Sequence, residues 1–235
     1  METNNYLEEY RKTNSRDLYR GLGGWMRRML DQQAAKSQQA DRHSLFMRRV
    51  LEVVALEADV PLKVMDIGCG DGKAISFDAP NISYYAIDRG DVYRTRLEAR
   101  GVDFRVLDVE QNPLPFEDDF FDIVMLNHVI EHIVQFDDLL NELHRVIKPN
   151  RFLYIRTPNI HKIGNDFWND YTHVHPFTDQ SLTTMCQAHG FECHRFLYSN
   201  YPRINLDILT GGKYRGLLCG KMFGGSELEA AYTKR

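Results

Sequence analysis

Acidic side chains at the ends of short apolar runs are the residues whose type and spacing first point to chemistry. The segment VMDIGCGDG places Asp66 just before a turn that contains Gly68 and Gly70, and the next two apolar runs end at Asp88 and Asp108. Glycines allow a tight turn and a close approach of the backbone to a ligand. Carboxylates at such positions can accept hydrogen bonds from ribose hydroxyls and from an amino group. The pattern therefore predicts a nucleoside-type ligand.

The spacing of the glycines distinguishes two such ligands. A dinucleotide site needs G-x-G-x-x-G and binds a pyrophosphate at a helix N-terminus, whereas the glycines here are Gly68, Gly70 and Gly72. Asp66 and Asp71 would repel a phosphate but attract a cation. The sulfonium and ammonium groups of S-adenosylmethionine meet that demand, so we predict this cofactor. A nicotinamide cofactor is the alternative, and a tight turn without a ligand is the purely structural interpretation.

The elements that must position these residues alternate along the chain. Apolar runs at 63–67, 84–87, 104–107, 123–126 and 152–155 are interspersed with candidate helices at 71–77, 92–100, 136–147 and 179–189. Continuous apolar strands between helices indicate a parallel sheet that is covered on both faces. Two later runs, 191–198 and 203–210, are predicted to form an antiparallel hairpin at one end of the sheet.

Composition sets limits on the class of protein. The 235 residues are 43% hydrophobic and 26% charged, which is typical of a folded globular chain. A net charge of -4 argues against nucleic acid as a partner. The four cysteines have no C-x-x-C spacing, which gives no support for a thiolate zinc site. Without a signal-peptide core or an apolar run of membrane length, we expect a cytoplasmic protein with no membrane span.

Four segments, taken in order, resemble the successive motifs of class I S-adenosylmethionine-dependent methyltransferases. They are VMDIGCGDG, YYAID, LDVEQNPLPFEDDFFDIVMLNHVIEHI and HRVIKPNRFLYIRTPN. The resemblance covers roughly residues 62–195. It implies an α/β fold with a doubly wound, seven-stranded Rossmann-like sheet whose last strand is reversed, which agrees with the hairpin predicted above.

The same resemblance implies a role for each residue of the cofactor site. The methionine end of the cofactor lies in the glycine turn, the ribose lies at Asp88, and the adenine lies at Asp108 and the amide of Val109. Residues just past the fourth strand face the cofactor from the other side. The expected cofactor-binding residues are Asp66, Gly68, Cys69, Gly70, Asp88, Arg89, Asp108, Val109, Asn127 and His128.

We expect three parts in the chain. Residues 1–60 form a helical extension whose last helix covers 41–58, and this extension serves either as a lid over the cofactor or as a contact with the sheet edge or with a second copy of the chain. Residues 61–210 form the S-adenosylmethionine-binding methyltransferase domain. Residues 211–235 are rich in glycine and are expected to form a flexible tail or a flap over the substrate.

A histidine-containing turn follows the fourth apolar run. His128, Glu131 and His132 match the H-x-x-E-H pattern of zinc proteases, which requires a helix and a third ligand. Here the residues follow a buried strand, so we interpret them as a histidine packed against the cofactor, with Glu131 fixing its tautomer. Related enzymes that methylate quinol precursors hold a divalent ion near this turn, with a glutamate where this chain has His128. We assign no metal, and the question of a divalent ion near these three residues stays open.

The segment FWNDYTHVHPFT, at 167–178, supplies the candidate acceptor site. It is similar to the D-x-T-H-x-R-P-F-T segment of methyltransferases that modify polysaccharides and sugars, but it has His175 where an arginine is usual. We predict that Trp168, Asp170 and Tyr171 bind the acceptor, and that Asp170 orients a histidine. The candidate catalytic bases are His173, His175 and His132. The structural alternative is that His173 only braces the loop.

Together these patterns predict methyl transfer from S-adenosylmethionine to a hydroxyl group of a small molecule or glycan, with a histidine as general base. Two other classes remain. One is a nicotinamide-dependent oxidoreductase on a similar fold, and the other is a subunit that binds S-adenosylmethionine without catalysis and serves a partner.

Overall fold

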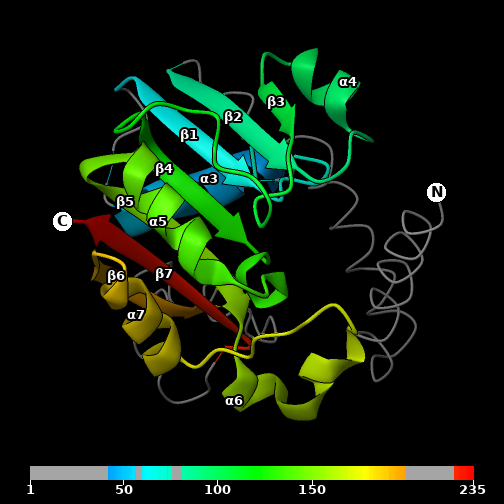
Figure 1. Cartoon of the computed structure of the whole chain (residues 1–235), viewed down its shortest axis with the longest axis vertical. Helices are drawn as coiled ribbons and strands as arrows, with labels where there is room; N and C mark the ends of the chain where they lie inside the picture. Colours follow the sequence, from blue (N-terminus) through cyan, green and yellow to red (C-terminus); the bar gives the residue numbers. More distant parts are fainter. Residues whose placement is uncertain (1–41, 55, 57–59, 73, 76–80, 200–224) are drawn as a thin grey trace, which may run out of the picture. The chain divides into compact units, whose positions relative to one another are not determined.

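A computed structural model describes residues 42–54, 56, 60–72, 74–75, 81–199 and 225–235. Its centre is a seven-stranded sheet with the strand order β3-β2-β1-β4-β5-β7-β6 (Figure 1). The strands are β1 (Leu62–Ile67), β2 (Ile82–Asp88), β3 (Asp103–Val106), β4 (Phe121–Asn127), β5 (Ile147–Pro158), β6 (Phe191–Ser199) and β7 (Glu227–Lys234). The helices are α3 (Arg42–Val54), α4 (Arg94–Glu98), α5 (Phe136–Val146), α6 (Ile160–Ile163) and α7 (Asp179–Ala188), with the 3-10 helices η1 (Ile130–His132) and η2 (Gly164–Asn169).

The direction of the strands confirms the predicted fold class. Strands β1 to β5 are parallel to one another, whereas β7 is antiparallel to both β5 and β6. The last strand of the chain is therefore the reversed one. Because the five parallel strands end at one edge of the sheet, the residues that follow them gather there, as ligand sites do in open α/β sheets.

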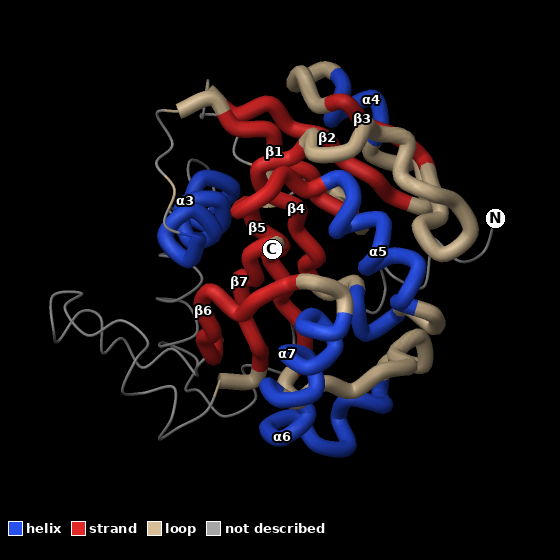
Figure 2. Tube along the Cα trace, turned by 60° about the vertical axis from the view of Figure 1, so that its left-hand side comes forward, coloured by secondary structure: helices blue, strands red, loops and turns tan. Residues whose placement is uncertain are grey.

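Alternating side chains of the central strands pack into two separate hydrophobic cores. Val124 and Leu126 of β4 pack with α5 and α7, whereas Ile123 and Met125 pack with α3. This follows from the period of two along a strand, which sends neighbouring side chains to opposite faces. Figure 2 shows α3 on one side of the sheet and α5 and α7 on the other. Both faces of β4 are buried, which explains the continuous apolar run at 123–126.

The helix predicted at 41–58 is confirmed as α3, but it does not belong to a separate extension. Met47, Val50 and Val54 of this helix are buried in the core on one face of the sheet. The compact unit that contains the sheet begins at His43. The domain boundary expected at residue 60 therefore falls too late in the chain. The predicted lid or contact role of residues 1–41 lies outside the described residues.

The C-terminal prediction is wrong for the last strand. The run at 191–198 is confirmed as β6, but its partner in the sheet is β7, and the predicted strand at 203–210 lies outside the described residues. Residues 227–234, expected in a tail or flap, instead insert between β5 and β6. Their sequence, ELEAAYTK, begins with alternating acidic and apolar residues, although Glu227 and Glu229 are buried as well.

No helix among the described residues is long and apolar enough to cross a membrane. The helix predicted at 71–77 lies partly outside the described residues, and its described part forms turns.

Candidate active site

The glycine turn after β1 lies at the carboxyl edge of the sheet. Gly68, Gly70 and Gly72 have φ angles of 69°, 50° and 75°, in the left-handed region that favours glycine. A Cβ atom at Gly68 would lie 2.5 Å from Cγ2 of Val129, which belongs to the turn after β4. Gly68 is thus required by both its conformation and its surroundings, and the turns after β1 and β4 lie in contact.

Asp88, at the end of β2, fixes this glycine turn. Its Oδ2 accepts a hydrogen bond of 2.8 Å from the amide of Gly70, and its Oδ1 accepts one of 3.0 Å from the amide of Gly90. The side chain is only partly buried. Each carboxylate oxygen can accept a second hydrogen bond. Asp88 is therefore held in one orientation and keeps acceptor capacity for hydroxyl groups of a ligand.

Asp66 gives the edge an unusual electrostatic character. The residue is 2% exposed, and its burial, together with the negative charge of Asp88, raises the pKa of its carboxyl to about 8. A cation beside it would favour the ionised form and lower that pKa. Burial also raises the pKa of the Cys69 thiol well above its usual range, so this residue is unsuited to act as a nucleophile. The region favours a positively charged ligand.

A third group of charges follows β3. Arg89 forms ion pairs with Asp108, at 3.2 Å, and with Glu110. Asp108 also accepts a hydrogen bond of 3.0 Å from the amide of Glu110, and Val109 lies between them in the chain. The structure thus brings Arg89, Asp108 and Val109 together, with Arg89 engaged by carboxylates. Glu110 is a member that the sequence analysis missed.

The end of β4 contributes two more predicted residues. The Oδ1 atom of Asn127 is buried and, among the described residues, has no hydrogen-bond partner. An orphaned acceptor of this kind indicates a place where a ligand or water donates. His128 has a φ angle of 56°, another left-handed conformation, which is uncommon for a residue with a Cβ. Such outliers concentrate at functional sites.

His128 is held between two carboxylates. Its Nδ1 lies 3.2 Å from Oε1 of Glu131, and its Nε2 lies 3.3 Å from Oε1 of Glu227. Burial alone would lower the pKa of His128, but the hydrogen bonds to Glu131 and Glu227 raise it to about 9. Glu131 therefore partners this histidine as predicted, although it stabilises the imidazolium and not a neutral tautomer. Glu227 could not be predicted from the sequence because it lies in the unforeseen strand β7.

Hydrogen bonds hold the segment 167–178, here called the acceptor loop, against η1. The backbone carbonyl of Glu131 accepts bonds of 2.8 Å and 3.1 Å from the amides of Val174 and His175. Nδ1 of His132 lies 3.1 Å from the carbonyl oxygen of Thr172. The loop after η2 and the turn after β4, forty residues apart in the chain for this last pair, form one structural unit.

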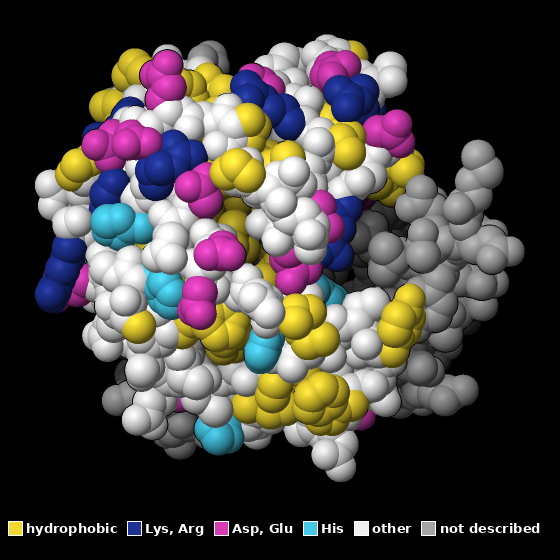
Figure 3. Space-filling model, viewed as in Figure 1, with side chains coloured by type: hydrophobic (Ala, Val, Ile, Leu, Met, Phe, Trp, Pro, Cys, Tyr) yellow, Lys and Arg dark blue, Asp and Glu magenta, His cyan; other side chains and the backbone are white. Residues whose placement is uncertain are grey.

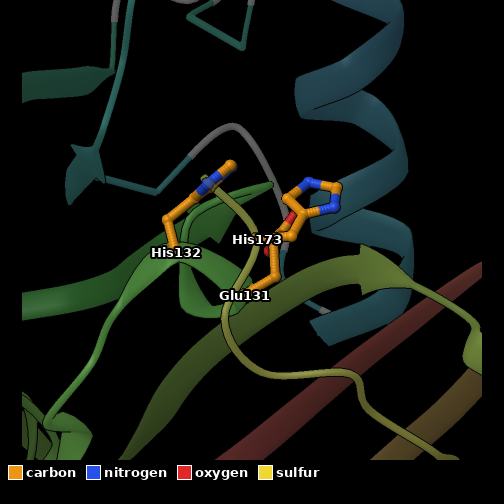
Figure 4. A group of neighbouring side chains, drawn as sticks. All are labelled: Glu131, His132 and His173. Atoms are coloured by element: carbon orange, nitrogen blue, oxygen red, sulfur yellow. The ribbon is translucent and has the colours of Figure 1, made fainter. Parts of the chain in front are cut away.

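His173 points into this unit beside His132 and Glu131 (Figure 4). Its Nδ1 lies 2.7 Å from the carbonyl oxygen of Phe167, and its ring centroid lies 4.8 Å from that of His132. A carbonyl oxygen only accepts, so Nδ1 must carry the proton, and the neutral ring then presents an unprotonated Nε2. His173 is thus oriented as a base would need to be.

The carboxylate of Asp170 contacts Thr172 and not His173, and it reaches a histidine only through the Thr172 hydroxyl, which lies 3.0 Å from Nδ1 of His132. Its Oδ1 accepts hydrogen bonds from the amide and the hydroxyl of Thr172, at 3.0 Å and 2.6 Å, and the residue is 7% exposed. Asp170 therefore stabilises the turn, and the carbonyl of Phe167 orients His173. Sequence alone gave no signal for a backbone carbonyl in this role.

His175 is separated from the other two histidines of the prediction. Its Nε2 lies 3.1 Å from the carbonyl oxygen of Val134, and its ring packs edge-on against Phe136 at the start of α5. These contacts brace the loop against α5. By contrast, Trp168 and Tyr171 are 55% and 71% exposed, so both are accessible to an acceptor. Figure 3 shows hydrophobic side chains gathered over the part of this face where α6 and η2 lie.

Comparisons with known proteins agree with this arrangement. Residues 38–195 match the family model described as a methyltransferase domain. The chain is 29% identical over 165 residues to a malonyl-[acyl-carrier protein] O-methyltransferase of Calditerrivibrio nitroreducens, with 66% of this chain and 62% of that protein covered. It is 28% identical over 156 residues to a probable S-adenosylmethionine-dependent methyltransferase of Mycolicibacterium smegmatis, with 63% and 60% covered. The chain thus spans about 60% of the length of these curated relatives.

A solved structure supports the fold. A S-adenosylmethionine-dependent methyltransferase from Archaeoglobus fulgidus superposes with a TM-score of 0.61 at 19% identity, over 82% of this chain and 94% of that one. The chain belongs to the methyltransferase-domain family, within the class I S-adenosylmethionine-dependent methyltransferases. The cofactor that this family implies is S-adenosylmethionine.

The residues at the carboxyl edge fit that cofactor. Its ammonium and sulfonium groups supply positive charge that would compensate the buried carboxylate of Asp66. Its ribose offers two hydroxyl donors to Asp88. The orphaned Oδ1 of Asn127 can accept a hydrogen bond from a donor of the cofactor. The glycine turn leaves the backbone accessible because Gly68 is exposed and has no side chain.

Proposed function

We propose that the protein transfers a methyl group from S-adenosylmethionine to a hydroxyl group of a small molecule or glycan. The observation that supports this proposal most directly is the position of His173. This histidine has its Nδ1 fixed by the carbonyl of Phe167, its Nε2 forms no hydrogen bond with the described residues, and it lies in a loop bonded to the turn after β4. That turn is in contact with the glycine turn through Val129.

The cofactor-binding roles divide along the sheet edge. Asp66, Gly68, Cys69 and Gly70 surround the methionine end, where the carboxylate of Asp66 pairs with the positive charge. Asp88 accepts hydrogen bonds from the ribose hydroxyls. On the far side of β2, Asp108 and the amide of Val109 bind the adenine, while Arg89 holds Asp108 in place. From the opposite side, Asn127 and His128 complete the site.

The chain's own residues supply proton removal and alignment. When bound, S-adenosylmethionine would supply the methyl group, whose bond to sulfur would break as the acceptor oxygen bonds to carbon, with S-adenosylhomocysteine as the product. The hydroxyl proton passes to Nε2 of His173, with His132 beside it as a second acceptor. General-base assistance of this kind contributes about 10²–10⁴-fold. Holding the acceptor in line contributes further by removing its freedom of orientation.

Exposed aromatic side chains suit an acceptor with a flat apolar face. Trp168 packs edge-on against Phe167, whose carbonyl orients His173. Trp168 thus lies one ring away from the base through Phe167, and both Trp168 and Tyr171 remain accessible. Aromatic rings of this kind contact sugar rings as well as planar small molecules. This is the basis for naming a small molecule or glycan as the acceptor class.

The test is formation of S-adenosylhomocysteine from S-adenosylmethionine and pools of hydroxyl-bearing acceptors, read by mass spectrometry. We expect product in at least one pool, with the mass of the acceptor raised by one methylene unit. Binding of S-adenosylmethionine without product in any pool would favour a non-catalytic partner subunit. A spectral change with NADH, and no binding of S-adenosylmethionine, would favour an oxidoreductase.

A further inference from the structure

Glu131, His132 and His173 form a compact cluster, the His–Glu cluster, at the junction of η1 and the acceptor loop (Figure 4). One potential ligand atom from each of the three side chains lies within 4.8 Å of the others. One carboxylate and two imidazoles form the donor set of several divalent transition-metal sites that keep open positions. The cluster is thus chemically equipped for more than proton transfer.

The hydrogen bonds of the two histidines prepare them as ligands. Nδ1 of His132 lies 3.1 Å from the carbonyl oxygen of Thr172 and 3.0 Å from its hydroxyl oxygen, whose own proton is donated to Asp170. Nδ1 of His173 lies 2.7 Å from the carbonyl oxygen of Phe167. Both neutral rings therefore carry their proton on Nδ1 and leave the lone pair on Nε2. Histidines that bind metal ions commonly donate their other ring N–H to a backbone carbonyl in this way, which fixes their tautomer and orientation.

The carboxylate is prepared in the same manner. Glu131 is fully buried, its Oε2 accepts a hydrogen bond of 2.9 Å from Thr157, and its Oε1 lies 3.2 Å from Nδ1 of His128. Each oxygen keeps a second lone pair, and carboxylates that bind metal ions are usually hydrogen-bonded themselves. His128 is not a ligand, because both its ring nitrogens are engaged by Glu131 and Glu227.

We propose that the His–Glu cluster binds one divalent first-row transition-metal ion, with zinc as the best match to two imidazoles and one carboxylate. Ligand bonds of about 2.0–2.2 Å require the donor atoms to approach one another by roughly 1 Å from their present separation. The backbone of the loop is already bonded to the carbonyl of Glu131, so the proposal assigns this approach to the side chains. Magnesium, which prefers oxygen ligands, fits the cluster poorly.

This site would change how the acceptor is activated, and that consequence rests on the proposed function. With the ion bound, the Nε2 lone pairs are used as ligands, and an acceptor hydroxyl at the open position loses its proton more readily. In the metal-free protein the same lone pair of His173 serves as the base. Binding of the ion itself does not depend on methyl transfer.

The experiment measures metal binding directly on the full chain after treatment with a chelator. Zinc is titrated in competition with a chromophoric chelator, and cobalt is added separately to read the visible absorption of its coordination sphere. We expect one equivalent of zinc. His132→Asn and His173→Asn should each weaken binding by about 100-fold or more, since each removes a ligand. His161→Asn is the matched control, because His161 is exposed on α6, outside the cluster.

The proposal is overturned if the wild-type chain takes up no zinc, or if His161→Asn weakens binding as much as the cluster variants do. Circular dichroism checks the fold of each variant, and if one cluster variant fails to fold, the other decides. Binding of S-adenosylmethionine is measured on the same samples. Loss of the metal with intact cofactor binding refutes the metal site alone, whereas zinc uptake without cofactor binding refutes only the proposed methyl transfer.

Discussion

The two halves of the sheet edge hold their carboxylates in different ways. On the β1–β2 side, Asp88 is fixed by backbone amides, and Asp66 is desolvated beside it with a raised pKa. On the β4–β7 side, Glu227 is paired with both His128 and Arg156. In the first half, burial and the charge of Asp88 disfavour the ionised form of Asp66, whereas the carboxylates of the second half are paired with cationic side chains. The difference suggests that a cationic ligand completes the first half, whereas the second half is complete as a scaffold for the histidines.

The largest expected effect is on catalysis and concerns the β4–β7 side of the sheet edge, called the histidine half because the candidate bases are held there. His173→Asn should lower kcat by about 10²–10³-fold, because it removes the base but preserves a polar side chain of similar size. Binding of S-adenosylmethionine should be unchanged. His175→Asn should lower kcat by less than about tenfold, since its ring braces α5 and lies apart from the pair. Equal losses in the two variants, measured by steady-state kinetics, would remove the distinction between them.

The next effect is on cofactor affinity and concerns the β1–β2 side of the sheet edge, called the cofactor half. Asp88→Ala should weaken binding of S-adenosylmethionine by roughly 100-fold, because hydrogen bonds to a charged acceptor contribute about 1.5–3 kcal/mol each. Asp103→Ala is the control, since this exposed carboxylate begins β3 and pairs with Arg105. Calorimetric titration measures both variants. Unchanged affinity in Asp88→Ala would show that the ribose is bound elsewhere.

Asp66 offers a direct test of how burial disfavours its ionised form. A buried acid whose pKa is raised to about 8 stabilises the fold below its unfolded value of about 4, and this contribution is lost as the pH rises through 8. Asp66→Asn should therefore increase the free energy of unfolding of the cofactor-free chain by about 2 kcal/mol at pH 9. Denaturant unfolding at pH 5 and pH 9 measures this gain. A variant that is less stable than the wild type at pH 9 would contradict the assignment.

The smallest effect is on stability and concerns the ion pairs of the histidine half. The raised pKa of His128 means that its ion pairs stabilise the fold fully below about pH 6.5, and that this stability is lost as the pH rises through 9. Glu227→Gln should cost about 1 kcal/mol at pH 6, because the His128 side chain is 38% exposed and solvent screens the pair. The part of the loss that depends on His128 should vanish above pH 9. If the loss of unfolding free energy in Glu227→Gln stayed constant from pH 6 to above pH 9, the pairing of Glu227 with Arg156 alone would account for it.

The cofactor half could be predicted from the sequence because its signals are local. Asp66 is the next-to-last residue of β1 and Asp88 ends β2, and the parallel arrangement of the two strands brings their ends together. The reversed last strand was predicted as well. Its residues were not, because β7 is buried on both faces and includes acidic side chains that are neutralised only in the fold.

The histidine half was less predictable because its geometry depends on contacts distant in the chain. Glu227 reaches His128 from nearly one hundred residues away only because β7 inserts beside β5. The separation of His175 from His173 depends on the carbonyl of Val134, and the orientation of His173 depends on that of Phe167. Contacts with backbone carbonyls leave no signature in the pattern of side chains. The sequence alone could therefore identify the candidate histidines but not which of them is oriented as a base.

The central claim is that the acidic half of the edge binds a cationic nucleoside cofactor. Calorimetric titration of the full chain with S-adenosylmethionine at pH 7, in buffers of different ionisation enthalpy, tests it most directly. The account predicts one binding site and release of a proton on binding, because the cation lowers the raised pKa of Asp66. Absence of binding, or binding without proton release in the wild-type chain, would contradict it.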